Sequence, residues 1–290
     1  MFGIILIDKE TGRTSHDVVD AIRRKFGTRR VGHAGTLDPL ATGLLVVAVG
    51  PATRFLQYLP LEPKEYVAEI TFGKSTSTLD LEGEVIEESP VPEDLLGSIE
   101  KVLGQFQGLI SQLPPMYSAV KVDGKPLYHY ARQGKLMDRE ARTVHIDKFE
   151  IRPVSPDTVR ARIVCSGGTY IRSLAHDLGQ AVGCGAHLTS LNRTKVGRFT
   201  LEQAVKLDGA EPKRLIKLRD GLPPMAIEVL NATQVDQIRE GRQVALDHEP
   251  EATIVALAEP GGEIFSVARV QGHLLQPECV IPSEAFHGVS

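Results

Sequence analysis

One aspartate stands in a segment of the sequence that is rich in glycine and threonine. The segment GHAGTLDPLATGLL runs from Gly32 to Leu45, and its only acid, Asp38, directly precedes Pro39. Glycines permit a tight loop in which backbone approaches a ligand closely, and the proline biases Asp38 toward an extended backbone. Asp38 is therefore a candidate for chemistry. Taken alone, the segment is better explained as a turn closed by its aspartate, so a second signal is needed.

A second stretch combines basic residues with rings, which is the composition of RNA-binding segments. Between residues 111 and 150 the basic residues are Lys121, Lys125, Arg132, Lys135, Arg139, Arg142 and Lys148, and the rings are Tyr117, Tyr128, His129 and Tyr130. A solvated connector with ordinary surface charge is the alternative interpretation. We favour RNA contact.

Charge is unevenly distributed along the chain. The formal net charge of −4 and the pI near 6.2 argue against a protein that is basic all over. Basic residues exceed acidic residues by 3 in residues 1–60 and by 7 in residues 111–200, whereas acids are in excess by 8 in residues 61–110 and by 6 in residues 201–290. One basic face could therefore meet a polyanion, because the local field steers association. Even mixing of these segments on folding is an equally good interpretation.

Apolar periodicity predicts the elements that must position these residues. Strands are expected at 3–7, 44–49, 66–72, 143–152 and 157–165, the last two as a hairpin. Helical spacing predicts helices at 16–26, with Ser15 as N-cap, at 92–106 and at 170–182. Strands and helices without strict alternation favour the α+β class, with a mixed or mostly antiparallel sheet.

The length of 290 residues suits one large domain and a small appendage. A Gly-Leu-Pro-Pro stretch at 221–224 is typical of a linker. After it, a helix is expected at 233–240 and strands at 253–258, 264–270 and 279–281, which predicts a small β-rich domain. We therefore divide the chain into domains at 1–225 and 226–290.

Cysteine usage and hydropathy indicate the compartment. Cys165, Cys184 and Cys279 are widely spaced and form no metal-binding motif, so they are expected to be buried thiols in a reducing environment. No stretch approaches the roughly 18 apolar residues that a membrane span needs. A soluble cytoplasmic protein is expected.

The Asp38 segment resembles the catalytic motif of the TruB-family pseudouridine synthases. Five further segments resemble blocks of that family in the same order: LIDKETGRTS, KEYVAEITFG, PPMYSAVKVDGKPLYHYARQG, CSGGTYIRSLAHDLG and AHLTSLNRTKVGRF. Six ordered matches over about 200 residues are far more specific than one short motif. Two positions depart from the family pattern, with Glu10 where proline is common and Ser77 where aspartate is usual.

The resemblance implies three catalytic residues. Asp38 would be the nucleophile or base that starts cleavage of the N-glycosidic bond, Tyr66 would stack on the uracil and move a proton, and Arg172 would pair with Asp38. Stacking on an aromatic ring offsets the few kcal/mol that extruding a nucleotide costs. Without the resemblance, Tyr66 would by default be a core aromatic and Arg172 a surface residue at a helix start.

The resemblance also implies substrate-binding residues, namely His33, Lys9, Leu191, Gly35 and Thr36. Leu191 would pack beside the bound base, and His33 would help to hold the RNA in its flipped arrangement. Lys9 belongs to the family's basic N-terminal motif. Judged singly, His33 is as well explained as a hydrogen-bonded loop histidine.

The family implies a pseudouridine synthase fold, with a mixed, mostly antiparallel central sheet flanked by helices. A thumb-like RNA-binding insertion would lie near 111–150, and a PUA-like RNA-binding domain would follow at 226–290. The expected reaction converts uridine 55 in the T loop of tRNA to pseudouridine, and a tRNA-folding role could accompany it. The expected substrate is the T arm of tRNA, bound by a monomer without cofactor, metal, guide RNA or membrane.

Three alternatives remain. A guide-RNA-dependent synthase shares the catalytic block but typically carries a more basic tail. A non-catalytic RNA-folding module could use the same surface. A glycosidase acting on sugars would need two paired carboxylates, and no second acid stands in a motif comparable to that of Asp38.

Overall fold

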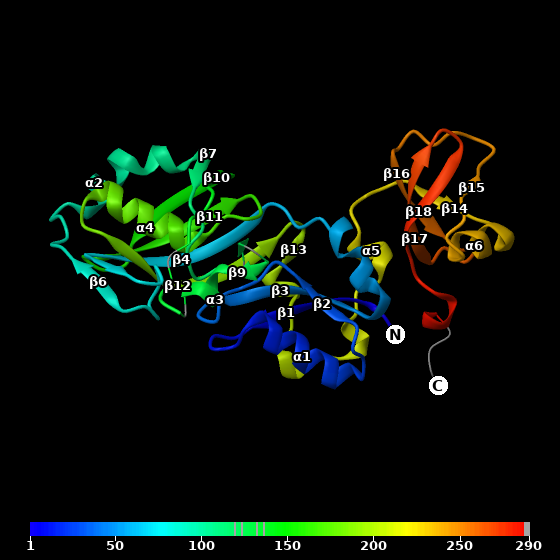
Figure 1. Ribbon diagram of the computed structural model, residues 1–290, viewed down its shortest axis with the longest axis horizontal. Coiled ribbons are helices and arrows are strands. Elements are labelled where there is room, and N and C mark those ends of the chain that lie inside the picture. The colour runs from blue at the N-terminus through cyan, green and yellow to red at the C-terminus, as the bar shows by residue number, and fades with distance from the viewer. Residues whose placement is uncertain (119, 123, 132, 136, 287–290) are drawn as a thin grey trace.

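The computed structural model describes residues 1–118, 120–122, 124–131, 133–135 and 137–286. The molecule is elongated, with a nine-stranded sheet through its main body and a five-stranded sheet at one end (Figure 1). The expected α+β fold is confirmed: a mixed, mostly antiparallel central sheet is flanked by helices and followed by a small β-rich domain.

Six α-helices occur in the part of the chain that the structure describes. They are α1 (Ser15–Phe26), α2 (Leu95–Leu103), α3 (Leu127–Ala131), α4 (Ile171–Val182), α5 (Leu218–Gly221) and α6 (Ala232–Arg239). The helices predicted at 16–26, 92–106, 170–182 and 233–240 correspond to α1, α2, α4 and α6. None of the helices in these ranges is long and apolar enough to cross a membrane.

The N-cap of α1 was predicted one residue too late. Thr14 is the cap: its hydroxyl accepts the N–H of Asp17, and the Asp17 carboxylate accepts the N–H of Thr14 in return. Ser15 is the first residue of the helix, so its hydroxyl is free to bond elsewhere. Both residues are good caps by type, and only the three-dimensional structure decides between them.

The central sheet has the strand order β1-β3-β12-β4-β11-β10-β7, with β2 also paired to β3 and β13 to β12. Its strands are β1 (Gly3–Lys9), β2 (Val31–Ala34), β3 (Thr42–Val49), β4 (Lys64–Phe72), β7 (Gly108–Gln112), β10 (Arg142–Pro153), β11 (Thr158–Cys165), β12 (Ala186–Val196) and β13 (Phe199–Thr200). All of these pairs are antiparallel except β12 with β3. A separate hairpin joins β5 (Lys74–Thr76) and β6 (Val85–Glu88).

Two helices bury opposite halves of this sheet. The apolar stripe of α1, which includes Val18, Val19 and Ile22, shares a buried cluster with residues of β1, β2 and β3. The apolar side of α4 shares a second cluster with residues of β4, β11 and β12. Because β12 and β3 pair only at Thr42 and Gly43, the two halves meet along a short parallel ladder. The segment 35–41, which contains Asp38, connects β2 to β3 and enters β3 at this junction.

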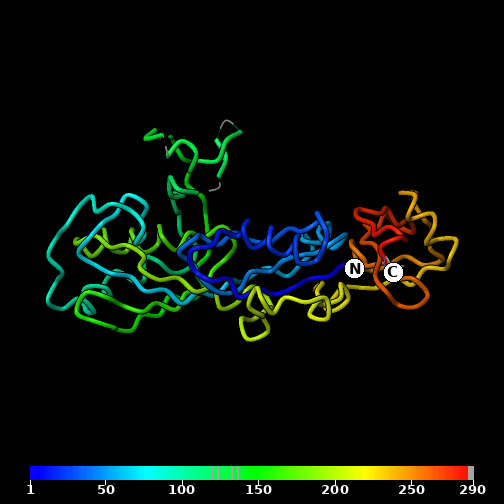
Figure 2. The backbone as a smooth tube through the Cα atoms, turned by 90° about the horizontal axis from the view of Figure 1, so that it is seen from below, coloured from blue at the N-terminus to red at the C-terminus, as the bar shows by residue number. Residues whose placement is uncertain are grey.

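An insertion at residues 113–141 leaves the sheet and returns to it. Its ends are neighbours, because Gln112 at the end of β7 and Arg142 at the start of β10 are paired across the sheet. It contains β8 (Lys121–Val122), β9 (Lys125–Pro126) and α3, and it projects from the body of the molecule (Figure 2). The segment predicted near 111–150 is thus partly sheet: Arg142 and Lys148 lie in β10. Arg132 lies outside the described residues.

The C-terminal sheet has the order β14-β16-β17-β18-β15. Its strands are β14 (Ile227–Val229), β15 (Val244–Ala245), β16 (Ile254–Ala258), β17 (Ile264–Gln271) and β18 (Leu274–Val280). It packs against the 3-10 helix η1 (Gly50–Tyr58) that follows β3, where Tyr58 donates to the Glu278 carboxylate at 2.6 Å and Arg54 to the Val280 carbonyl at 2.7 Å. One apolar cluster, with Phe55, Leu222 and Leu230 among its members, continues through this joint.

Candidate active site

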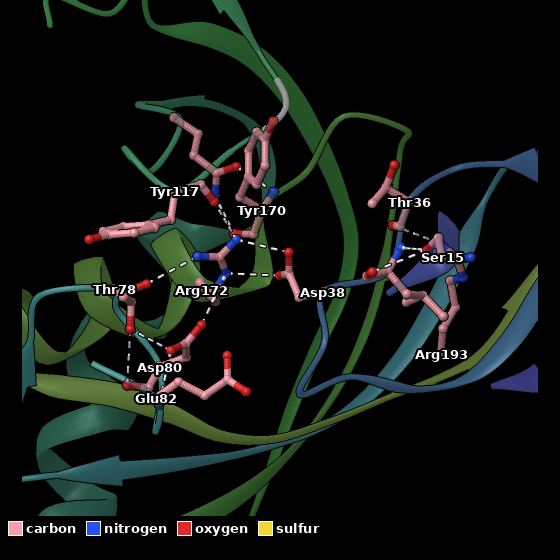
Figure 3. Close-up of polar contacts among 12 residues, drawn as sticks. Ser15, Thr36, Asp38, Thr78, Asp80, Glu82, Tyr117, Tyr170, Arg172 and Arg193 are labelled. Atoms are coloured by element: carbon pink, nitrogen blue, oxygen red, sulfur yellow. Dashed lines mark hydrogen bonds and ion pairs between the residues drawn. The ribbon is translucent and has the colours of Figure 1, made fainter. Parts of the chain in front are cut away.

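Asp38 and Arg172 form a two-point ion pair at the junction of the two half-sheets (Figure 3). Arg172 Nε donates to Asp38 Oδ2 at 2.9 Å and Nη2 to Oδ1 at 3.0 Å. Bidentate pairing fixes the orientation of a carboxylate as well as its position. The Arg172 side chain is 4% exposed and that of Asp38 is 33% exposed, so the carboxylate is open to a substrate while its partner is not.

A second acid, Asp80, holds Arg172 from behind. Its Oδ2 lies 3.6 Å from Arg172 Nε, and its Oδ1 is bonded by the Thr78 hydroxyl and the N–H of Glu82. The Thr78 carbonyl accepts from Arg172 Nη1 at 3.1 Å. A buried guanidinium is tolerated when its donors and charge are satisfied in this way. Asp80 thus helps to orient the Arg172 guanidinium toward Asp38.

The insertion also reaches this arginine. Arg172 Nη2 donates to the carbonyl of Tyr117 at 2.8 Å. At the base of the insertion the Gln112 amide accepts the N–H of Tyr170 at 2.7 Å and donates to its carbonyl at 3.0 Å. Since Tyr170 is the N-cap of α4, the insertion and the start of the helix that carries Arg172 are joined.

The N-terminal segment supports the part of the loop that follows Asp38. Lys9, only 1% exposed, donates to the carbonyls of Glu10, Arg13 and Pro39 at 3.0, 2.6 and 3.2 Å. Burial lowers the pKa of Lys9 to about 8, although Asp38 opposes this shift. The ammonium thus supports the backbone of the Asp38 loop through the Pro39 carbonyl, and its predicted contact with the substrate stays a prediction.

Arg193 holds Gly35 and Thr36, the part of the loop that precedes Asp38. This arginine is 1% exposed and donates to the carbonyls of Gly35 at 3.0 Å, Thr36 at 3.4 Å and Leu44 at 2.8 Å. Gly35 has φ +79°, a conformation that favours glycine, and a Cβ there would lie 3.3 Å from Lys64 Nζ. The backbone of Gly35 is therefore part of the site, while the side chain of Thr36 is exposed.

Tyr66 and Leu191 lie together in the apolar core below the loop. Both belong to the cluster that contains Leu37, and Tyr66 is 7% exposed. Burial raises the pKa of Tyr66; the charge of Arg193 opposes this rise, and the charge of Asp38 adds to it. These influences place the Tyr66 hydroxyl in the electrostatic field of both charged groups.

His33 lies on β2, within the electrostatic influence of Arg193. Burial lowers its pKa, and the charges of Arg193 and His16 lower it further. Its Nδ1 is buried and has no hydrogen-bond partner among the described residues. The pKa of Lys64 is lowered as well, mainly by burial and then by Arg193. The site thus combines one open carboxylate with several buried or half-buried cations.

A cavity of about 680 Å³ opens where the insertion meets β10, next to the start of α4. Its lining includes Leu127, Arg139, Arg142 and the Gly167-Gly168 turn. The Arg142 guanidinium lies 5.4 Å from the ring centroid of Tyr170, two residues before Arg172. No group of three or more His, Cys, Asp or Glu side chains within the described ranges could hold a metal ion.

Three residues of this arrangement were not foreseen from the sequence: Asp80, Gln112 and Arg193. Asp80 lies in the segment STSTLDLEG, which ends in glycine. The same segment contains Ser77, where the family usually has aspartate, and the Ser77 hydroxyl accepts the N–H of Glu84 at 3.2 Å. An acid in such a turn is a signal that could have been used. Gln112 and Arg193 carry no comparable local signal.

Comparison with known proteins defines the class. A family model described as TruB family pseudouridylate synthase, N-terminal domain, matches residues 23–171, and a model described as tRNA pseudouridylate synthase B, C-terminal domain, matches residues 172–215. Proteins named tRNA pseudouridine synthase B are 43% identical in Thermobifida fusca, covering 96% of this chain and 98% of the relative, and 46% identical in Opitutus terrae, covering 77% and 92%. The chain belongs to the TruB family of pseudouridylate synthases.

Solved structures match the whole fold. A Cbf5-Nop10-Gar1 complex contains a chain with TM-score 0.66 and 28% identity, covering 98% of this chain and 86% of that chain. An H/ACA RNP bound to a substrate RNA containing 2′-deoxyuridine gives TM-score 0.65 and 26% identity, covering 97% and 85%.

Proposed function

We propose that this protein converts uridine 55 in the T loop of tRNA to pseudouridine, with Asp38 starting the cleavage of the N-glycosidic bond. The curated relatives named tRNA pseudouridine synthase B support the reaction and the class of substrate. The single observation that carries the proposal is the pairing of an open Asp38 carboxylate with a buried, doubly paired Arg172.

The reaction needs a carboxylate that is ionised and fixed. Bond C1′–N1 breaks, the detached uracil turns, and bond C1′–C5 forms. C5 then loses its proton, and N1 gains one. The bidentate contact with Arg172 keeps the Asp38 carboxylate in one place while the base moves. Asp38 acts on the sugar, either by attack at C1′ or by removal of the C2′ proton.

The flipped uracil would meet Tyr66 and Leu191. Both residues lie in the core cluster beneath the Asp38 loop, which supplies an apolar surface for a base that is briefly unattached. Since Tyr66 is 7% exposed, its ring must be uncovered further as the nucleotide enters. Gly35 would let the RNA backbone approach closely, and His33 would contact the flipped nucleotide from β2.

The insertion and the C-terminal domain would contribute affinity. Lys121, Lys125 and Lys135 are exposed on the insertion, which projects from the body (Figure 2). The insertion contacts Arg172 through the Tyr117 carbonyl. We assign residues 1–225 to the catalytic domain and residues 226–290 to a PUA-like RNA-binding domain. The identities of 40–46% to tRNA enzymes, against 26–28% to the chains from RNP-type assemblies, favour action without a guide RNA. We further propose that the protein acts as a monomer in the cytoplasm.

The decisive experiment uses an unmodified tRNA transcript and compares wild-type protein with Asp38→Asn. Wild type is expected to form pseudouridine at position 55 without a guide RNA. The variant should lose at least about 1,000-fold in rate, because the amide supplies neither a nucleophile nor a base. Its dissociation constant for tRNA should stay within about threefold, since Asp80 still balances the charge of Arg172.

The matched control is Asp147→Asn, which removes an exposed aspartate on β10. It should leave rate and affinity unchanged. Product formed by Asp38→Asn at the wild-type rate would disprove the role of Asp38. Binding and refolding of tRNA by a wild-type protein that forms no pseudouridine would favour the RNA-folding module instead.

A further inference from the structure

Ser15 lies directly behind the Asp38 loop. Its hydroxyl donates to the carbonyl of Leu37 at 3.1 Å and accepts the N–H of Leu37 at 2.8 Å (Figure 3). Leu37 immediately precedes Asp38, so one side chain from α1 satisfies both backbone groups of the residue next to the carboxylate. The two residues are 22 positions apart in the sequence, which makes this a tertiary contact.

This serine has no part in capping its own helix. Thr14 fills that position, with its hydroxyl on the N–H of Asp17. Ser15 is 2% exposed, and burying a hydroxyl is unfavourable unless its hydrogen bonds are made. Both of its bonds go to Leu37, so the contact with the loop accounts for its hydrogen-bonding capacity.

Leu37 is fixed on its other side as well. Its side chain is buried in the cluster that contains Tyr66 and Leu191. The backbone of Leu37 is thus tied to α1 while its side chain is buried in the same apolar cluster as Tyr66. A shift of Leu37 would move Asp38 relative to the apolar cluster that contains Tyr66 and Leu191, even if Arg172 moved with Asp38 and kept their ion pair.

We propose that Ser15 is a positioning residue for the isomerisation: through Leu37 it fixes the position of the Asp38 carboxylate in the site. This inference rests on the proposed function. Displacement of a reacting group by about 1 Å can cost about 100-fold in rate without weakening binding. Ser15 should therefore affect the chemical step and leave the affinity for tRNA unchanged.

The test compares Ser15→Ala with Thr14→Ala in single-turnover assays at saturating tRNA. Ser15→Ala should lower the rate constant by about 10- to 100-fold with the dissociation constant for tRNA within twofold of wild type. Thr14→Ala removes the N-cap of the same helix, so it should lower the melting temperature and leave the rate constant within twofold. Both assays are run well below either melting temperature.

A third variant, Ser15→Cys, guards against misfolding because the thiol is close in size to the hydroxyl but bonds weakly. Its rate constant should lie between those of wild type and Ser15→Ala, and it replaces the alanine variant if that does not fold. A rate within twofold of wild type in the Ser15 variant, or equal slowing in Thr14→Ala, overturns the inference. If wild type itself forms no pseudouridine, the proposed function fails first, so the two failures are distinguishable.

Discussion

At the scale of single residues, the site is organised by cations that face inward. Arg172 and Arg193 are buried on either side of the loop, and one orients the Asp38 carboxylate while the other holds the backbone at Gly35 and Thr36. Arg193 has no carboxylate partner among the described residues, and its charge lowers the pKa of His33 and of Lys64. The loop is therefore pre-arranged before any RNA arrives.

The lowered pKa of His33 predicts a pH dependence of stability. In the unfolded chain this histidine gains its proton near pH 6.5, whereas in the folded protein it does so only at lower pH. The unfolded state therefore binds more protons as the pH falls below 6.5, so the His33 contribution to the free energy of unfolding is present above that pH and is lost below it. His33→Gln should reduce this loss.

The measurement is urea unfolding of wild type and variant at pH 7.5 and pH 5. The difference in unfolding free energy between the two pH values should be smaller in His33→Gln than in wild type. His273→Gln, which changes an exposed histidine between β17 and β18, is the control and should behave like wild type. An unchanged pH dependence in His33→Gln would mean that His33 does not carry the linkage.

At the scale of elements, the local patterns were readable and the contacts between them were not. The spacing of Val18, Val19 and Ile22 predicts α1, and alternation from Tyr66 predicts β4, because each follows from one element burying one face. Arg193 reaches Gly35 across 158 positions, a proximity that no local pattern encodes. The family motifs identified Arg172 and Asp38, 134 positions apart, where periodicity could not.

The insertion makes a prediction of its own. Its exposed lysines, Lys121, Lys125 and Lys135, are expected to neutralise phosphates of the tRNA. Replacing all three with glutamine should weaken binding and reduce the slope of log affinity against log salt by about 2 to 3, since each phosphate contact contributes about 0.7 to 0.9. The rate constant at saturating tRNA should change little, because none of the three side chains touches the Asp38 loop.

Filter binding or fluorescence titration of tRNA over a range of salt concentrations measures that slope. A matched triple variant changes Lys74, Lys101 and Lys213, which are exposed outside the insertion. Equal loss of slope in both triple variants would show that the effect is general charge and not contact by the insertion.

At the scale of the whole molecule, the C-terminal sheet shares an apolar joint with the main body. Leu218 and Leu222 belong to the same buried cluster as Leu230 and Phe265, and every residue that holds the Asp38 loop precedes residue 194. We therefore expect the joint to affect stability and to have little effect on the chemical step. Of the polar contacts at the joint, Tyr58 with Glu278 is exposed and should contribute less than about 1 kcal/mol.

A chain ending at residue 225 separates these effects. Losing the cover over Leu218 and Leu222 should cost about 3 kcal/mol or more, at about 1.5 kcal/mol or more for each leucine, and lower the melting temperature by roughly 6 to 12 °C. Glu278→Ala in the full chain should cost far less, because apolar burial and not the Tyr58–Glu278 hydrogen bond dominates. The single-turnover rate constant of the shortened chain at saturating tRNA should stay within about threefold of wild type.

Calorimetry of the full chain should show one transition, because a shared core couples the two sheets. Two separate transitions, or a shortened chain as stable as the full one, would contradict a shared core.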